Sequence, residues 1–546
     1  MKIQSFLPIV VGGFVALAFP GCGPRETQVE SGIRNGILHA ANGTEPQDID
    51  PHTVTGVPEH NVISALIEGL VAEDPVDLHP VPGVAETWNV SDDNRVYTFN
   101  FRDDAKWSNG DPVTAIDFVL SYKRMLTPSL ASEYSYMLHY VVNAREYNAG
   151  QLTDFSQVGF KALDDETLEI SLVDPTPFFL NLLNHYSWFP VHIPTVAKFG
   201  GLDRKGTKWT LPGNFVGNGP FNLKKWQMNQ VIIVEKSATY WDHDNVSLNQ
   251  VRFYPIESQD TEERMFRTGQ LHYTQSVPLS KIDVYKAEKP DLIHIGPYLG
   301  VYYLRVNVTI PPLNDVRVRR ALALAIDRES IVTNVTKGGQ IAAYNFTPLD
   351  TAGFTSRFHL EGDLEDAKRL LADAGYPNGE GFPTFELLYN TSESHRVLAE
   401  AFQQMWAARL NINVDLVNQE WKVYLDSQDT LGYQICRGGW IADYVDPHVF
   451  LEIFVTGGGN NDTGWSNIIY DELLGQALKA PSVSDRYEIY QKMETILMTE
   501  LPVIPIYFYT RVNLRDPSVR GFHPTVLDHH PYKNITLEDY TTTRGD

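Results

Sequence analysis

Cysteine is almost absent from this sequence. The 546 residues include two cysteines, Cys22 and Cys436. So few thiols exclude a disulfide framework and a cysteine-rich zinc site. Stability must therefore come from apolar cores, and a chain of this length is too long for one core, so two or three domains are expected.

Basic residues are also scarce relative to acidic ones. The chain has 44 Lys and Arg against 68 Asp and Glu, a formal net charge of −24. This balance argues against nucleic acid and anionic lipid as main partners, because both attract basic surfaces. An acidic surface suits a soluble protein but does not identify a ligand.

Long apolar runs are missing beyond the N-terminus. Residues 6–19 are mostly apolar and follow Lys2, a pattern typical of an export signal. No other stretch approaches the 18 apolar residues expected of a membrane-spanning helix.

Two processing sites fit this signal. Ala16-Leu17-Ala18 fits an A-x-A cleavage site, whereas "FPGC" resembles a lipoprotein box that ends at Cys22. We favour lipidation at Cys22, with a signal peptide over 1–21 and a polar tether over 22–35. The expected location is the periplasm or the outer face of the cell membrane, with a lipid anchor.

Common catalytic motifs are absent. The sequence has no H-E-x-x-H, G-x-S-x-G, Walker or C-x-x-C motif. "GNGPF" at 217–221 lacks the last glycine of a dinucleotide fingerprint and indicates a turn. The doublet His529-His530 has no further ligands nearby in sequence and is typical of a solvated tail. Ligand capture without a metal or cofactor is the leading hypothesis, with an exported hydrolase as the alternative.

What is present is a mixture of strand and helix periodicity. Apolar residues alternate at 96–101 and 168–172, which predicts strands. Helical spacing predicts helices over 314–339, with a cap-type Asn314, and over 364–379. Residues 399–417 are typical of a helix followed by a strand. Together these patterns predict an α/β fold.

One carboxylate stands in an apolar setting. In "GGWIADYVDP", Asp443 is flanked by Trp440, Ile441, Ala442 and Tyr444. An isolated buried charge costs several kcal/mol unless it is paired. Three explanations remain open: an exposed loop aspartate, a salt bridge to a distant arginine, or a partner that does not belong to the chain.

Several long segments carry a resemblance that covers about residues 35–535. The chain resembles the family 5 extracellular solute-binding proteins of bacterial ABC importers, and in particular the peptide-binding members. Long matches in one order are specific, although no single match would be. They are "PGVAETWNVSDDNRVYTFNFRDDAKWSNGDPVTAIDFVLSYKR" (82–124), "LNDVRVRRALALAIDR" (313–328), "LLYNTSESH" (387–395), "LVNQEWKVYLD" (416–426) and "RGGWIADYVDP" (437–447).

The resemblance implies a periplasmic-binding-protein-like α/β fold of type II, in the large cluster with an extra domain. Its main lobes close over a buried peptide. The implied boundaries are 36–67, 198–299 and 511–546 for lobe I, 68–197 for an inserted lobe II, and 300–510 for lobe III.

The resemblance also implies a function. The protein would be a monomer that captures short peptides and delivers them to an ABC permease and ATPase complex, without catalysis, cofactor or nucleic acid. A narrower ligand, such as a dipeptide, a murein peptide, nickel or haem, remains an alternative.

The family pattern assigns roles to particular residues here. Asp443 would pair with the free α-amino group of the peptide, and removing one partner of such a buried pair costs ~3–5 kcal/mol. Main-chain bonds would run along Thr55-Gly56-Val57 and Gly439-Trp440-Ile441, with the peptide added as a strand. Gly438 and Gly439 would let its backbone approach, or simply mark a bend. The walls and the carboxylate side would be formed by Trp421, Trp440, Arg437, His395 and Lys337.

The sequence departs from the family pattern at a few of these positions. Gln428 replaces an arginine, Thr336 replaces a lysine, and Thr55 replaces an acidic residue. These changes leave the preferred peptide length open. Gly300 and Ile441 stand where a family member has a pair of bridging cysteines, so both cysteines are lost together.

Overall fold

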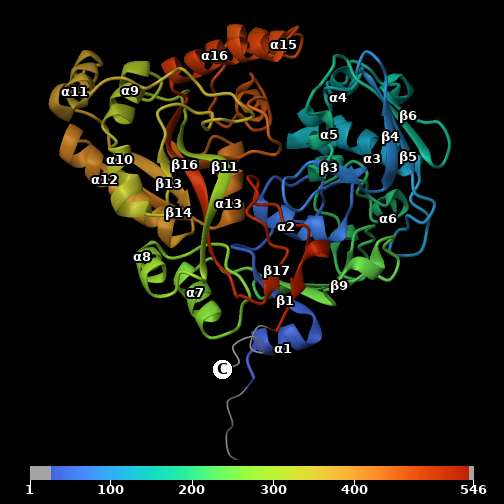
Figure 1. The fold of residues 1–546 in the computed structure, drawn as a ribbon. Coiled ribbons are helices and arrows are strands. Elements are labelled where there is room, and N and C mark those ends of the chain that lie inside the picture. Colours follow the sequence, from blue (N-terminus) through green and yellow to red (C-terminus); the bar gives the residue numbers. More distant parts are fainter. Residues whose placement is uncertain (1–25, 540–546) are drawn as a thin grey trace, which may run out of the picture.

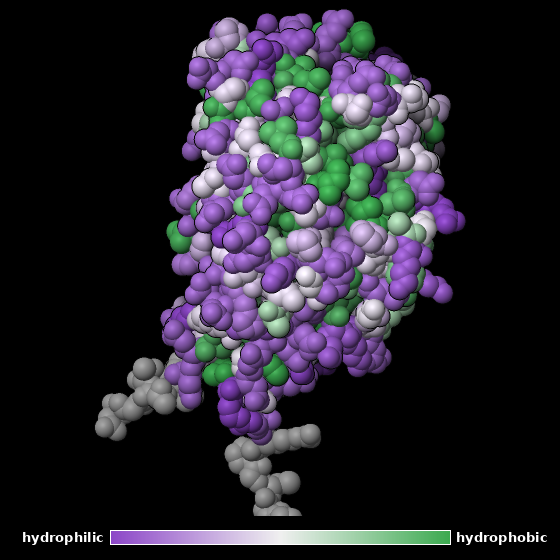
Figure 2. Space-filling view, turned by 90° about the vertical axis from the view of Figure 1, so that its right-hand side faces the viewer, coloured by the Kyte–Doolittle hydropathy of each residue, from purple (hydrophilic) through white to green (hydrophobic). Residues whose placement is uncertain are grey.

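The computed structural model describes residues 26–539, which fold into two bodies beside one another above a shared base (Figure 1). The predicted export signal and Cys22 lie outside the described residues. No helix among residues 26–539 is long and apolar enough to cross a membrane. The face that carries the insert described below is mostly hydrophilic, with hydrophobic residues gathered in its upper middle (Figure 2).

The base contains a four-stranded sheet, here called the N-terminal sheet. It brings a strand from residues 37–41 beside strands from residues 221–254, with β1 parallel to β10. Its order is β1 (Ile37–Ala41), β10 (Gln250–Tyr254), β9 (Val231–Lys236) and β8 (Phe221–Gln227). Helix α2 (Val57–Leu66) follows β1 in sequence, and helices α7 (Gln259–Arg267) and α8 (Leu279–Glu288) follow β10.

The later part of the predicted tether, 22–35, is helical. Residues Gln28–Asn35 form helix α1, which Thr27 caps together with Glu30 in a capping box. Val29 is buried, so this helix packs on the fold rather than linking it to a membrane.

The second sheet is antiparallel and lies within residues 71–198, a segment here called the insert, so we call it the insert sheet. The two strands predicted by alternation at 96–101 and 168–172 are confirmed as β5 and β7, which pair with each other. The sheet order is β4 (Ala85–Val90), β5 (Val96–Phe101), β7 (Thr167–Ser171) and β6 (Phe160–Ala162). The accompanying helices are α3 (Ala115–Leu126), α4 (Ala144–Asn148), α5 (Phe179–Leu182) and α6 (Ile193–Lys198), and a small hairpin joins β2 (Val71–Glu73) to β3 (Pro80–Pro82).

The third sheet, the large sheet, is mixed and has six strands. Its order is β12 (Ile341–Ala342), β16 (Val503–Leu514), β11 (Ile293–Val306), β15 (Ile435–Ile441), β13 (Phe385–Asn390) and β14 (Val414–Gln419). The helix and strand predicted over 399–417 are confirmed as α12 (Glu393–Leu410) and β14. The other long helices here are α11 (Leu364–Asp373), α13 (Trp421–Asp429), α15 (Ile468–Ala477) and α16 (Val483–Glu500).

The single helix predicted over 314–339 is wrong. The segment is divided into α9 (Val316–Leu324), the short α10 (Arg328–Ser330) and a π-helix over Ile331–Thr336. Asp327 interrupts the helix because its side chain accepts a hydrogen bond from the Ser330 N–H and starts a new turn. The first cap is Asp315, not Asn314.

Strands β11 and β16 run side by side from the large sheet down to the base (Figure 1). Their antiparallel register shifts between Pro297 and Val301. Beyond β16, Arg515 bridges to Tyr273, which in turn bridges to Ala40 of the N-terminal sheet. The two strands therefore cross together from one part of the molecule to the other.

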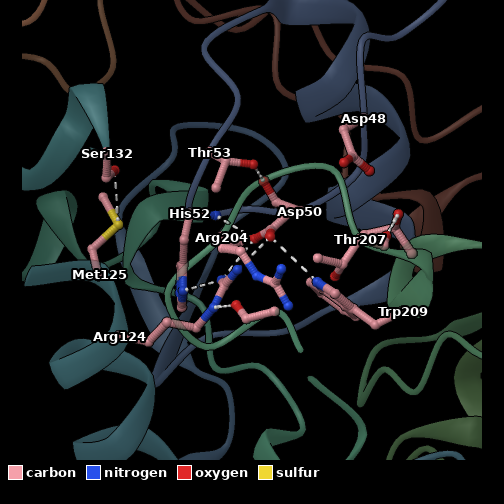
Figure 3. A network of polar contacts seen from close by, with 12 residues as sticks. Asp48, Asp50, His52, Thr53, Arg124, Met125, Ser132, Arg204, Thr207 and Trp209 are labelled. Atoms are coloured by element: carbon pink, nitrogen blue, oxygen red, sulfur yellow. Dashed lines mark hydrogen bonds and ion pairs between the residues drawn. The ribbon is translucent and has the colours of Figure 1, made fainter. Parts of the chain in front are cut away.

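A buried polar network joins the N-terminal segment to the insert (Figure 3). Arg124 of α3 donates to both carboxylate oxygens of Asp50, at 2.9 and 2.5 Å, and both side chains are 1% exposed. The Trp209 indole also donates to Asp50, and His52 lies 3.0 Å from Arg124. Burial lowers the pKa of His52 to about 4, so its ring is neutral and leaves the Asp50–Arg124 charges paired with each other.

Candidate binding site

A cavity of about 480 Å³ is lined by residues of the N-terminal segment, of the insert and of the large sheet. Its size is within the range of small-ligand sites. The N-terminal segment contributes residues 55–57, the insert contributes Tyr134 and His185, and the large sheet contributes Arg437 and Asp443. Residues from all three parts therefore enclose one space.

Asp443 lies just beyond the end of β15, in the wall of this cavity. Its side chain is 11% exposed, and its Oδ1 is 3.3 Å from the His185 Nε2 atom. The Tyr134 hydroxyl donates to the same oxygen at 3.5 Å. Oδ2 is buried and has no hydrogen-bond partner among residues 26–539. Asp443 is thus neither an exposed loop aspartate nor part of a salt bridge with an arginine of the described chain.

Arg437 lies on the same strand and also lines the cavity. It donates to the Tyr509 hydroxyl at 2.8 Å, and its guanidinium carbon is 5.2 Å from the centre of the Tyr302 ring. Its Nε is buried without a partner, and within 26–539 no carboxylate forms an ion pair with it. A cation in this state favours an anionic ligand group.

His395 of α12 also lines the cavity and lies beside the Tyr302 ring, which Arg437 contacts as well. Burial and the nearby charge of Arg437 lower the pKa of His395 well below 6.5. The ring is therefore neutral at pH 7 and can donate one hydrogen bond but no charge.

Strand β15 presents part of its edge to the cavity. The strand pairs with β11 along its whole length, whereas its parallel register with β13 covers only Ile435 and Cys436. In the described register, the other edge is unpaired from Gly438 to Ile441, and these residues line the cavity. Such an edge can accept an extended peptide as an added strand.

The two glycines of β15 have different roles. A Cβ at Gly438 would lie 2.6 Å from the Tyr303 ring, so the strand packs there without a side chain. A Cβ at Gly439 would lie 2.8 Å from Arg437 Nη2 and from the Tyr509 hydroxyl, on the cavity side. Both positions lie within a continuous strand, so they do not mark a bend.

Thr55, Gly56 and Val57, at the start of α2, also line the cavity. The first N–H groups of a helix lack partners within the helix, which leaves donors at this point. Glu59 Oε2 lies 2.0 Å from the position that a Gly56 Cβ would occupy, so only glycine fits there without moving Glu59. Burial raises the pKa of Glu59 to about 7.

Trp421 and Trp440 both line the cavity, and both indole nitrogens are buried. The Trp440 nitrogen has no hydrogen-bond partner among residues 26–539, whereas Trp421 interacts with the carboxyl group of Glu59. Lys337 does not line the cavity: its Nζ is 3.0 Å from an Asp283 carboxylate oxygen on α8. Among the predicted site residues, Lys337 is the one that the structure places elsewhere. The reason is its left-handed backbone, with φ 57°, at the end of the π-helix.

Gln428 has a partner that the sequence did not reveal. Its side-chain oxygen accepts a hydrogen bond from Arg305, whose Nη1 also lies 3.0 Å from Asp462. Arg305 lines the cavity, but its charge is already balanced by Asp462. No local pattern marks Arg305, His185 or Tyr134, because their significance depends on partners distant in sequence.

The expectation that His529-His530 is a solvated tail is wrong. The His529 Nδ1 is 2.9 Å from Glu73, and the His530 Nε2 is 2.9 Å from Asp528. His529 also stacks on His60, with ring centres 4.4 Å apart, and lines the cavity. Glu73 is 456 residues away in sequence, so the pairing was not visible locally.

Gly300 and Ile441 are direct cross-strand partners in β11 and β15. The Ile441 Cδ1 lies 2.4 Å from the position of a Gly300 Cβ. The isoleucine side chain therefore fills the space that the glycine leaves open, and an apolar contact joins the strands at this point.

A profile described as bacterial extracellular solute-binding proteins, family 5, matches residues 79–462. The chain belongs to this family. It is 39% identical over 526 residues to the periplasmic oligopeptide-binding protein OppA of Escherichia coli, covering 94% of this chain and 95% of that protein. The predicted family and fold class are confirmed.

Solved structures of the family show the same architecture. OppA of Haemophilus influenzae in complex with the peptide RPPGFSPFR matches with a TM-score of 0.88 and 33% identity, over 92% of this chain and 99% of that one. The murein tripeptide-binding protein MppA of E. coli matches with a TM-score of 0.87 and 36% identity, over 92% and 98%. Its unliganded open form matches with a TM-score of only 0.63 at 35% identity, over 95% and 100%. The arrangement described here is therefore unlike that open form.

Proposed function

We propose that this protein captures short peptides outside the cytoplasm and delivers them to an ABC-type importer. The observation that carries the proposal is the buried Oδ2 of Asp443, which has no hydrogen-bond partner among residues 26–539, in a cavity that also contains Arg437, a cation without a carboxylate partner in the described chain. A peptide with free termini supplies an ammonium and a carboxylate, one for each group.

The main chain of the peptide would be held by two walls. The open edge of β15 at 438–441 would form strand-like hydrogen bonds, and the start of α2 at 55–57 would supply donors from the other side. Trp421 and Trp440 would provide apolar surface with indole donors. Backbone contacts of this kind favour many sequences rather than one.

We also propose the predicted division into lobes I, II and III, with closure about the crossing strands β11 and β16. The ligand would shift the equilibrium toward the closed arrangement only by its extra affinity for that state. The importer would be a permease and ATPase complex of the cytoplasmic membrane, and the binding protein would perform no catalysis.

One experiment tests capture against catalysis. The purified protein is incubated with a mixture of peptides of two to ten residues, separated from free peptide by gel filtration, and denatured for mass spectrometry. Intact peptides retained with the protein are expected. Recovery of cleaved fragments would support the hydrolase alternative, and recovery of a metal or haem in place of peptides would support a narrower ligand.

Amidation of the peptide C-terminus is expected to cost ~1–3 kcal/mol of binding, because Arg437 and neutral His395 would lose a charged acceptor. In the Arg437→Met variant, the acid and the amide should bind about equally in calorimetry. A penalty that persists in this variant would place the carboxylate elsewhere.

Since Gln428 and Thr336 supply no cation, selectivity among peptide lengths should be loose or shifted.

Membrane attachment through Cys22 is part of the proposal. The Cys22→Ser variant should move from the membrane fraction to the soluble extracytoplasmic fraction, because a processed lipoprotein carries several acyl chains and stays bound. Immunoblots of the two fractions measure the change. If the wild-type protein is already soluble, cleavage after Ala18 is the better explanation.

A further inference from the structure

We propose that His185 is a positioning residue for the amine site: it holds Oδ1 of Asp443 so that Oδ2 faces the ligand. This inference rests on the proposed peptide-binding function and adds a specific residue from the insert. Neither the family resemblance nor the local sequence identified His185.

The protonation of His185 follows from its own hydrogen bonds. His185 caps the short 3₁₀ helix Tyr186–Trp188, and its Nδ1 accepts a hydrogen bond from the Ser187 backbone N–H at 3.3 Å. A nitrogen that accepts from a backbone N–H carries no proton. The neutral imidazole therefore carries its proton on Nε2, which is the atom nearest to Asp443.

The ring is fixed in place by its neighbours. The His185 side chain is 4% exposed, and its ring centre lies 4.6 Å from that of Tyr134 and 4.1 Å from that of Tyr186. Both insert groups that approach Asp443, His185 Nε2 and the Tyr134 hydroxyl, approach the same oxygen, Oδ1. Oδ2 is therefore the oxygen that has no hydrogen-bond partner in the part of the chain that the structure describes.

The contact between His185 and Asp443 is close, but its geometry is not that of a hydrogen bond. The Nε2–Oδ1 distance is 3.3 Å, yet within residues 26–539 neither His185 Nε2 nor Asp443 Oδ2 has a partner of hydrogen-bond geometry. The terminal torsion of an aspartate is soft. A small rotation of the carboxylate can align Oδ1 with the Nε2–H while Oδ2 turns to the ammonium.

A neutral donor suits this task better than a cation. A lysine or arginine beside Asp443 would neutralise the carboxylate and compete with the ligand's ammonium. A neutral imidazole orients the carboxylate and leaves its full negative charge for the ligand. Because His185 belongs to the insert and Asp443 to the large sheet, the oriented carboxylate forms only when these two parts meet.

A double-mutant cycle tests the inference with tri-, tetra- and pentaalanine as probes in calorimetry. His185→Leu is expected to weaken binding about 10-fold or more in the wild-type background, the effect of one hydrogen bond to a charged group. In the Asp443→Asn background the same change should cost less than about 2-fold, because a positioning residue acts only through its partner. His185→Gln, which keeps a donor at the same reach, should stay within about 3-fold of wild type.

Two results would overturn the inference. One is an equal loss from His185→Leu in both backgrounds, which indicates a general packing role. The other is an equal loss from His185→Leu and His185→Gln, which excludes the donor. Failure of the wild type to bind any of the peptides, or to retain any from the mixture, would instead contradict the proposed function. Melting temperatures within a few degrees of wild type confirm that the variants fold.

Discussion

Asp443→Asn is expected to weaken binding of peptides with a free amino terminus by ~3–5 kcal/mol, roughly 100-fold or more. The carboxylate is 11% exposed, and its Oδ2 has no partner within residues 26–539. An asparagine of the same shape keeps the packing but offers the buried ammonium no opposite charge. Isothermal titration with tri- to pentaalanine measures the change.

Two comparisons make this result specific. Asp429→Asn removes one negative charge from the same cavity, but Asp429 is exposed, so its effect should be about 1 kcal/mol or less. N-acetylated peptides should bind the wild type poorly and should lose little further affinity in Asp443→Asn. Equal binding of free and acetylated peptides to the wild type would show that Asp443 is not the amine anchor.

Arg124→Met is expected to lower the free energy of unfolding by ~3–5 kcal/mol, because Asp50 would keep a buried charge without its partner. Both side chains are 1% exposed, and neutral His52 cannot replace the guanidinium. The remaining donors, the Trp209 indole and the His52 backbone N–H, leave the charge uncompensated. Differential scanning calorimetry and urea unfolding measure the loss.

A matched exposed pair provides the control. Arg357 and Glu488 lie 2.6 Å apart but are 65% and 58% exposed, so Arg357→Met should cost about 1 kcal/mol or less. Adding Asp50→Asn to Arg124→Met should recover part of the stability, because the stranded charge is removed. Similar small losses from Arg124→Met and Arg357→Met would contradict the assigned role of the buried pair.

Features set by local pattern could be predicted from the sequence. The alternation at 96–101 is a property of a half-buried strand and needs no knowledge of the partner. The apolar setting of Asp443 raised the question of its partner but left three explanations open. The break at Asp327 was missed because helical spacing continues across it, and only the cap shows where one helix stops.

Features set by distant partners could not be predicted. His185 acquires its role from Asp443, which is 258 residues later in the chain, and His529 acquires its buried position from Glu73. Lys337 lies next to a cavity residue, Thr336, but the turn of the backbone directs its side chain to Asp283. At the end of a helix, the position of one residue in a cavity therefore does not predict where the side chain of the next residue points.

The register shift between Pro297 and Val301 has a mechanical consequence. A bulge in an antiparallel pair disrupts the ladder locally, bends the strand and increases its twist, so closure of the lobes as proposed would bend the two crossing strands at this point. If the lobes close about this two-stranded ribbon as proposed, they would swing about one axis and meet along the same line. Under the proposed function, peptides of different length would change what lies between the lobes but not the outline of the closed protein, so one importer would receive all of them through a single contact surface.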